Sequence, residues 1–298
     1  MNMNIVQSWN FIFFCFLFFI FSEKDRTNFV GAVFPNVTNY ELHLYPYAHI
    51  AVHDFLPLEY FNELERDFPK VSLEEIQGIR VNGKLYLNET PLMAQLFRTS
   101  DAYQRLVSYV NSMSFVNWIM NIYGHEIKKL FVTHNCSVNP DKAFIEYYPE
   151  NFTIALSDEA KNFTRDIKLK KIQPPPGHDN NRLFSRIDLI HGFNGYYSMR
   201  IHEDLPHRLV GLLLHLDELH EHSGGAFEFR NPKNKTDIVK KIVPKRNMLM
   251  THLSGSPSAR HSVGLFHDRE NPDLMRRAIH IQIAAHQNIC REHNDKPH

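Results

Sequence analysis

Apolar and polar positions follow two different patterns in the two halves of the chain. Segment 57–69 and a longer region from about 92 to 123 repeat apolar residues at helical spacing, after a strand-like alternation at 49–56. From Ala143 onward the apolar residues form short runs or alternate singly with polar ones: AFIEYY, RLFSRIDLIHG, RLVGLLLHL, GAFEFR, NMLMTHL and RAIHIQIAA. We predict an α+β protein in which N-terminal helices support a jelly-roll core, a double-stranded β-helix.

An unbroken apolar run from Phe11 to Phe21 lies ahead of this pattern, and Ser22 and the charged residues EKDR follow it at once. The run is too short to cross the hydrocarbon core of a membrane as a helix. We therefore interpret residues 1–22 as a signal peptide that is cleaved after Ser22. Because the residues before the run include no lysine or arginine, an uncleaved signal anchor is the alternative, and only then do we expect membrane contact.

The leader divides the chain into successive regions. We predict an N-terminal segment after it, then one large domain, and last a short tail. Within the domain, helical support over 46–140 precedes a jelly-roll core over about 141–290. The four predicted regions are therefore 1–22, 23–45, 46–290 and 291–298.

Six Asn-x-Ser/Thr sequons support entry into a eukaryotic secretory pathway. They begin at Asn36, Asn88, Asn135, Asn151, Asn162 and Asn234. Together with the leader, they predict a glycoprotein that resides in the endoplasmic reticulum lumen or is secreted. Outside the leader the cysteines are Cys136 and Cys290, which could form one disulfide in an oxidising lumen, although the sequence does not show that they meet.

The charge composition argues against one class of partner. Lysine plus arginine and aspartate plus glutamate both number 33, so the formal net charge is zero. Nucleic-acid binding usually needs a basic surplus, so we expect no nucleic-acid partner. Hydrophobic residues make up 43% and charged residues 22% of the 298 residues, which is a composition that can bury a globular core.

Two candidate metal ligands lie one residue apart in the strand-like run Tyr196–Glu218. Side chains on a strand alternate between its faces, so His202 and Asp204 point the same way and Glu203 points away. A third candidate, His261, stands where the polar sequence PSAR passes into an apolar run. Two histidines and one carboxylate match the facial triad of non-haem Fe(II) oxygenases, which leaves the opposite coordination positions open. In a chain with 19 histidines this spacing arises by chance, so the surrounding sequence has to decide.

Four sequence blocks around these residues occur in an order that resembles a known family. They are IHEDLPHRLVGLLLHLDE, then HSGGAFEFRNP, then IVPKRNMLM with SARHSV, and last RRAIHIQI. Over about Arg186 to Ile283 they resemble the catalytic core of the prolyl 4-hydroxylase-like 2-oxoglutarate/Fe(II) oxygenases. The resemblance implies that His202, Asp204 and His261 are the iron ligands, with no catalytic residue beyond the metal centre. It also implies 2-oxoglutarate and O₂ as co-substrates, with ascorbate as a further candidate cofactor.

The family binds the far carboxylate of 2-oxoglutarate with a lysine or arginine on the strand after the second histidine. The candidates here are Arg276 and Arg277, and the alternation of side chains along a strand separates them. Arg277 shares its face with isoleucines that are typical of a packed core. Arg276 shares a more polar face with His280 and Gln282. A planar guanidinium can grip a carboxylate bidentately. The resemblance therefore implies that Arg276 binds 2-oxoglutarate, with His280 as a further candidate contact.

The sequence departs from the family between the second histidine and this arginine. Arg276 lies 15 positions after His261, a longer gap than is usual in the family. We interpret LFHDRENPDL as an insertion in this turn. By distance alone, Arg269 within the insertion is an alternative anchor for 2-oxoglutarate.

Other histidines near the triad are interpreted as solvated. His215, His220 and His222 belong to the sequence HLDELHEH, which we expect to form a surface loop rather than a metal site. His207 and Arg208 follow the His-x-Asp motif and are expected at the rim of the pocket or in solvent.

The resemblance implies an enzyme of the secretory pathway that hydroxylates a C–H bond, with prolyl or lysyl residues of secretory-pathway proteins as candidate substrates. A small-molecule substrate is an alternative. A secreted jelly-roll binding protein without turnover is the alternative from another class, and zinc in the same cage is a third possibility.

Overall fold

The computed structural model describes residues 34–35, 40–71, 84–86, 91–110, 112–133, 183–205, 208–256 and 259–285. Several predicted features lie outside these residues: the leader, His207, Cys136, Cys290 and the sequons at Asn36, Asn88, Asn135, Asn151 and Asn162. Within the described part, no helix is long and apolar enough to cross a membrane.

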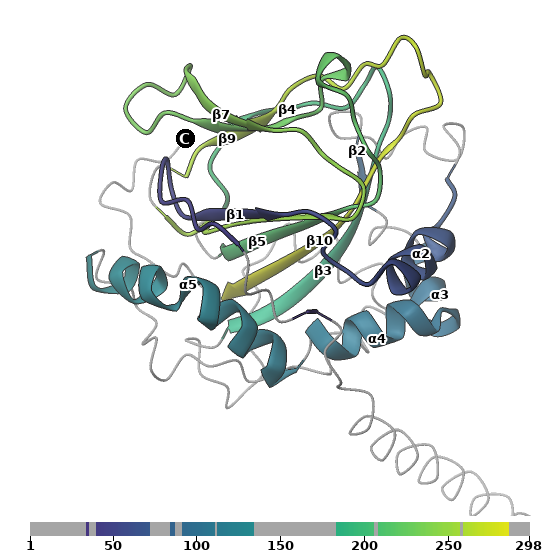
Figure 1. The fold of residues 1–298 in the computed structure, drawn as a ribbon, viewed down its shortest axis with the longest axis horizontal. Helices are drawn as coiled ribbons and strands as arrows, with labels where there is room; N and C mark the ends of the chain where they lie inside the picture. The colour runs from purple at the N-terminus through teal and green to yellow at the C-terminus, as the bar shows by residue number, and fades with distance from the viewer. Residues whose placement is uncertain are drawn as a thin grey trace, which may run out of the picture.

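Two antiparallel β-sheets face each other in the structure (Figure 1). The larger sheet has the strand order β1-β8-β5-β10-β3-β2, and the smaller has the order β4-β9-β6-β7. The strands are β1 His49–Val52, β2 Lys84–Tyr86, β3 Leu183–Gly192, β4 Met199–His202, β5 Arg208–His215, β6 Phe227–Arg230, β7 Ile238–Ile242, β8 Met248–His252, β9 His261–Val263 and β10 Arg276–Ala285. The predicted combination of helices with a β-rich core is therefore present.

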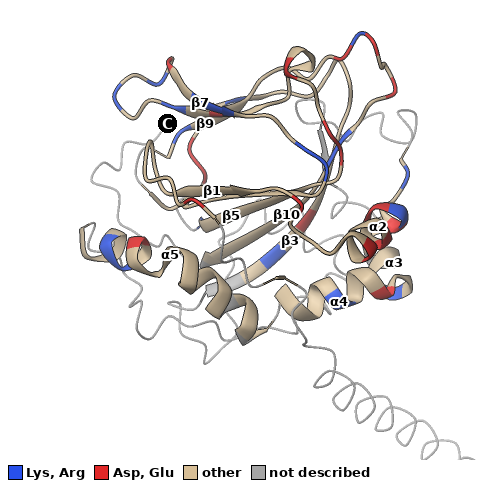
Figure 2. Ribbon diagram, viewed as in Figure 1, with Lys and Arg blue, Asp and Glu red and all other residues tan. Residues whose placement is uncertain are grey.

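Helices cover the outer face of the larger sheet (Figure 1). They are α2 Leu58–Asp67, α3 Pro91–Thr99, α4 Asp101–Val110 and α5 Met113–Thr133, and a short 3-10 helix, η3 Glu221–Ser223, follows β5. The helical region predicted over 92–123 is thus divided, and Ser100 explains one division because its hydroxyl accepts a hydrogen bond from the Tyr103 backbone N–H at 3.3 Å. A serine in this position caps the start of the next helix. α2 and α5 each carry both basic and acidic residues, in keeping with the balanced charge (Figure 2).

Strand β10 separates two apolar clusters, because its alternate side chains enter different ones. Ile279, Ile281 and Ile283 belong to the larger cluster, which contains the buried residues of the helices. Ala278 belongs to a second cluster between the two sheets, with Phe227, Tyr197 and Phe266. The predicted alternation of β10 side chains between two faces is confirmed. The second cluster lines the space between the two sheets.

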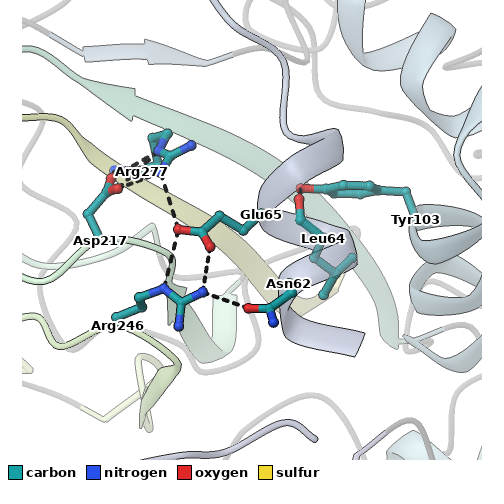
Figure 3. Close-up of polar contacts among 7 residues, drawn as sticks. All are labelled: Asn62, Leu64, Glu65, Tyr103, Asp217, Arg246 and Arg277. Atoms are coloured by element: carbon teal, nitrogen blue, oxygen red, sulfur yellow. Dashed lines mark hydrogen bonds and ion pairs between the residues drawn. The ribbon is translucent and has the colours of Figure 1, made fainter. Parts of the chain in front are cut away.

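Arg277 lies on the helix-facing side of β10 and joins the sheet to α2 (Figure 3). Its Nη2 donates to Asp217 Oδ1 at 2.7 Å and lies 3.6 Å from Glu65 Oε1 on α2. Arg246 Nη2 donates to the other oxygen of Glu65 at 2.6 Å. The carboxylate of Glu65 therefore lies between two arginines and connects helix α2 to residues near the ends of two strands.

The insertion predicted before Arg276 forms the loop between β9 and β10. The side-chain amide of Asn194 donates to the carbonyls of Asp268 at 2.8 Å and Asn271 at 3.0 Å. Asn194 Oδ1 in turn accepts the backbone N–H of Asp268 at 2.9 Å. Arg269, the alternative anchor within this loop, is exposed.

Candidate metal centre

The three predicted iron ligands meet at one end of the smaller sheet. His202 ends β4, His261 begins β9, and the two residues are direct partners in the antiparallel pairing of these strands. Asp204 lies two residues beyond β4, yet the alternation continues, because Glu203 points away and ion-pairs with Arg260 at 2.7 Å. One ligand atom from each of His202, Asp204 and His261 lies within 4.8 Å of the others. Among the described residues, this is the group of three that could hold a metal ion.

Hydrogen bonds orient both imidazole rings for metal binding. His202 Nδ1 lies 2.9 Å from the Arg200 carbonyl, and His261 Nδ1 lies 3.1 Å from the Ala259 carbonyl. A carbonyl accepts only, so Nδ1 carries the proton in each ring and the Nε2 lone pair is free for a metal. Second partners of this kind fix the tautomer of metal-binding histidines. Two imidazole nitrogens and a carboxylate are a donor set that fits Fe(II) and leaves coordination positions open.

The protonation states of the buried ligands also suit a metal. Burial lowers the pKa of His261 to about 3, although the nearby Asp204 carboxylate acts in the opposite direction. Burial alone would raise the pKa of Asp204, but the hydrogen bond from His252 and the positive charge of Arg208 hold it well below its usual range. His261 is therefore neutral and Asp204 ionised at neutral pH, which are the forms that bind metal ions.

Two residues contact the Asp204 carboxylate although the sequence did not indicate that they belong to the site. The side chain of Arg208 was expected at the rim or in solvent, but only 21% of it is exposed and its Nη1 donates to Asp204 Oδ1 at 2.7 Å. His252, at the end of β8, was not singled out, and its Nε2 lies 3.4 Å from Asp204 Oδ2. Neither contact is visible in the sequence, because one depends on the side-chain orientation of Arg208 at the start of β5 and the other on a strand 48 residues away.

A second polar group lies between the two sheets, around Arg276. This side chain is only 1% exposed, its Nε donates to the Gly225 carbonyl at 3.0 Å, and its Nη1 donates to Tyr197 Oη at 3.2 Å. Its Nη2 is buried and has no hydrogen-bond partner among the described residues. A buried guanidinium without a carboxylate partner is costly, so the arrangement favours an anionic ligand at this nitrogen.

His215 lies next to this guanidinium, which corrects the prediction that it belongs to a solvated loop. His220 and His222 are exposed as expected, but β5 continues through His215 and turns its side chain into the buried space between the sheets. Burial and the charge of Arg276 lower the pKa of His215 well below its ordinary value. Both ring nitrogens lack a hydrogen-bond partner within the described part of the chain. A neutral imidazole here can donate one hydrogen bond to a ligand that Arg276 holds.

His280 shares the inner face of β10 with Arg276, as predicted, and is half-buried. Its Nε2 lies 3.1 Å from the side-chain amide of Gln282. His280 lies two residues beyond Ala278 on this face, so Ala278 separates it from Arg276. The candidate role of His280 as a contact of 2-oxoglutarate remains a prediction.

Comparison with known proteins gives matches among solved structures only. No family model and no curated protein matches the sequence. A prolyl hydroxylase from Trichoplax adhaerens, solved with a peptide fragment of the hypoxia inducible factor oxygen degradation domain, is 13% identical with a TM-score of 0.40 and covers 95% of this chain and 94% of its own. A prolyl-4-hydroxylase from Pseudomonas putida is 12% identical with a TM-score of 0.36, over 80% of this chain and 92% of its own.

An oxidoreductase of the 2OG-Fe(II) oxygenase family from Burkholderia pseudomallei is 14% identical with a TM-score of 0.28. The match covers 49% of this chain, and the chain spans only 63% of the length of that protein. The three solved structures named here are thus two prolyl hydroxylases and one member of the 2OG-Fe(II) oxygenase family. Identities and TM-scores this low do not assign an activity, so the function has to be inferred from the side chains of the site.

Proposed function

We propose that this protein is a 2-oxoglutarate-dependent Fe(II) dioxygenase in which His202, Asp204 and His261 hold the metal. The observation that carries the proposal is that the triad and the buried guanidinium of Arg276, whose Nη2 has no partner among the described residues, lie between the same two sheets. His261 stacks on Phe227 with ring centroids 4.8 Å apart, and Arg276 lies 4.8 Å from the centre of the Tyr197 ring. Both rings belong to one apolar cluster, so the two polar groups share one lining.

The strand order supports a double-stranded β-helix as the architecture. The eight strands β3 to β10 are distributed between the larger sheet (β3, β5, β8, β10) and the smaller sheet (β4, β6, β7, β9). Except at the β6–β7 hairpin, each strand is followed by one in the opposite sheet, which is how a jelly roll winds its chain. On this basis we keep residues 46–290 as one domain, and β1 and β2 extend its larger sheet from the N-terminal side.

The chain's own residues divide the chemistry between holding the metal and orienting the co-substrate. Fe(II), once bound with 2-oxoglutarate, would supply the activation of O₂ that couples decarboxylation of 2-oxoglutarate to hydroxylation of a C–H bond. Arg276 would bind the far carboxylate through its free Nη2, with His215 as a second donor. The apolar cluster around Phe227 would exclude water from the space between the two groups.

The test is anaerobic reconstitution of the full chain with Fe(II), followed by O₂ and measurement of CO₂ release from 2-oxoglutarate. We expect Fe(II)-dependent release that is stimulated by a substrate peptide, because turnover without substrate is slow. Prolyl- and lysyl-containing peptides are the first candidates, and zinc in place of Fe(II) should give no release. Binding of 2-oxoglutarate without any CO₂ release would instead favour a jelly-roll binding protein that lacks turnover.

We further propose that the protein acts in the secretory pathway, on prolyl or lysyl residues of other proteins there. The support is the apolar leader with the six sequons and, for the substrate class, the sequence resemblance. Hydroxylation of a small molecule remains the alternative, and mass spectrometry of candidate peptides after turnover would separate the two.

Asn234 is expected to carry an N-linked glycan when the protein is expressed in a eukaryotic secretory host. It lies exposed in the β6–β7 hairpin loop, and its Oδ1 accepts a hydrogen bond from the Thr236 hydroxyl at 2.8 Å. Asn234→Gln should remove the mass of one glycan, as judged by intact mass before and after glycosidase treatment. Asn231→Gln is the matched control, because Asn231 lies in the same loop but precedes Pro232 and is no sequon. Masses of wild type and Asn234→Gln that differ only by the one methylene group of the substitution would contradict the prediction.

A further inference from the structure

The carboxylate of Asp204 is held at both oxygens by side chains outside the metal triad. Arg208 Nη1 donates to Oδ1 at 2.7 Å. His252 Nε2 lies 3.4 Å from Oδ2, and the metal-binding nitrogen of His261 lies 4.0 Å from the same oxygen. Oδ2 therefore faces the other ligands and Oδ1 faces Arg208. A free aspartate carboxylate rotates easily, because the torsion that turns it has broad minima, so these contacts restrict it to one orientation.

The backbone around Arg208 places its guanidinium by regular structure. Arg208 is the first residue of β5, and its N–H donates to the Leu205 carbonyl at 2.9 Å. At the same end of β5, the Gly255 N–H donates to the Leu209 carbonyl at 3.1 Å. The side chain starts from a fixed strand end, so its contact with Asp204 is built into the sheet.

The ring of His252 is fixed from several sides. It is buried at the end of β8, with the Ser254 hydroxyl 3.1 Å from the same Nε2 that faces Asp204. Gly211 lies opposite on β5, and a Cβ atom there would stand 2.8 Å from His252 Cε1. Only glycine leaves room for the ring at that position. Phe227 packs against another side, with ring centroids 5.3 Å apart.

We propose that Arg208 and His252 are positioning residues that set Asp204 as a one-oxygen ligand of the metal. Arg208 holds Oδ1 away from the metal, and His252 directs Oδ2 toward the two histidine ligands. The inference rests on the proposed metal centre and adds to it the residues that fix its only anionic ligand.

Two effects of Arg208 on the metal oppose each other. Its positive charge repels a divalent cation and withdraws electron density from the carboxylate, so removing it should strengthen binding. Its hydrogen bond fixes the orientation of Asp204, so removing it should weaken binding. Two features would screen this repulsion. The carboxylate would lie between the metal ion and the Arg208 guanidinium, and the guanidinium is partly exposed to solvent. Outer partners of metal ligands typically contribute a factor of roughly 10–100 in metal affinity, so we expect orientation to prevail.

The experiment titrates the full-length apo protein with Co(II) alone and follows the visible absorption of the bound ion, which reports its coordination geometry. Arg208→Met should weaken Co(II) binding by roughly 10–100-fold and change the spectrum. Arg208→Lys retains a charged donor and should restore part of the affinity. His252→Phe preserves a buried ring without the donor and should also weaken binding. Arg260→Met is the matched control, because Arg260 pairs with neighbouring Glu203 at the same 2.7 Å but points away from the metal.

Three outcomes would overturn the inference. Co(II) binding by Arg208→Met that equals or exceeds the wild type would show that orientation by Arg208 contributes nothing. A loss of apo-protein thermal stability with an unchanged Co(II) spectrum would make Arg208 a structural residue only. If Arg208→Met does not fold, Arg208→Lys and His252→Phe decide, and wild-type affinity in both would overturn the inference. Failure of the wild type to bind Co(II) would instead reject the metal centre itself, whereas failure of 2-oxoglutarate turnover with intact Co(II) binding would leave this inference standing.

Discussion

Replacing any one of His202, Asp204 and His261 by alanine is expected to abolish Fe(II)-dependent CO₂ release from 2-oxoglutarate. Each change removes one of three protein ligands from a centre in which their donor atoms lie within 4.8 Å of one another. Asp204→Glu should fail as well, because the longer side chain misplaces its oxygen relative to Arg208 and the two imidazoles. The measurement is CO₂ release by variants reconstituted with Fe(II) side by side with the wild type.

The variants should remain folded, because these polar side chains contribute little to the apolar clusters of the protein. Circular dichroism and thermal unfolding of the apo variants would check this. His222→Ala is the matched control, since His222 is an exposed histidine outside the triad and its loss should leave CO₂ release unchanged. Near-native release by a variant of His202, Asp204 or His261 would remove that residue from the metal centre.

The sequence predicted the elements whose side chains alternate with a clear period. Parity alone placed Arg276 and Arg277 on opposite faces of β10, and the structure agrees, because Arg276 is buried between the sheets and Arg277 pairs with Asp217 and Glu65 on the helix side. The same argument predicted that Asp204 and His202 point the same way, and they do, although β4 ends at His202. Period-2 alternation is a local property of the extended chain, so a short segment contains all the information needed.

The sequence failed where contacts depend on neighbouring strands. His215 resembled part of a histidine-rich surface loop, yet it is the last residue of β5 and is buried beside Arg276. His252 had no motif around it, and its role follows only from pairing between β8 and β5, where Gly211 makes room for its ring. Contacts of this kind depend on register between distant segments, which a single sequence does not reveal. They are also the contacts that complete the two polar groups of the site.

Exchanging Arg276 for methionine is expected to weaken binding of 2-oxoglutarate by one to two orders of magnitude without destabilising the protein. A hydrogen bond to a charged group contributes roughly 1.5–3 kcal/mol, and about 1.4 kcal/mol corresponds to a tenfold change in affinity. Methionine keeps much of the buried stem volume. Because Nη2 has no partner in the described protein, its removal relieves a desolvated charge, and the apo variant should be at least as stable as the wild type.

Arg277→Met should show the opposite pair of effects, which makes the two adjacent arginines controls for each other. The change removes the Arg277 guanidinium from the carboxylates of Asp217 and Glu65, so the free energy of unfolding should fall by roughly 1–3 kcal/mol in urea denaturation. Affinity for 2-oxoglutarate, measured by calorimetry on the metal-loaded protein without O₂, should match the wild type, and so should that of Arg269→Met in its exposed loop. A large loss of 2-oxoglutarate affinity in Arg277→Met or Arg269→Met, with Arg276→Met unaffected, would move the anchor to the other residue. The metal centre would survive that result, because Arg276 is not one of its ligands and iron affinity should be the same in all three variants.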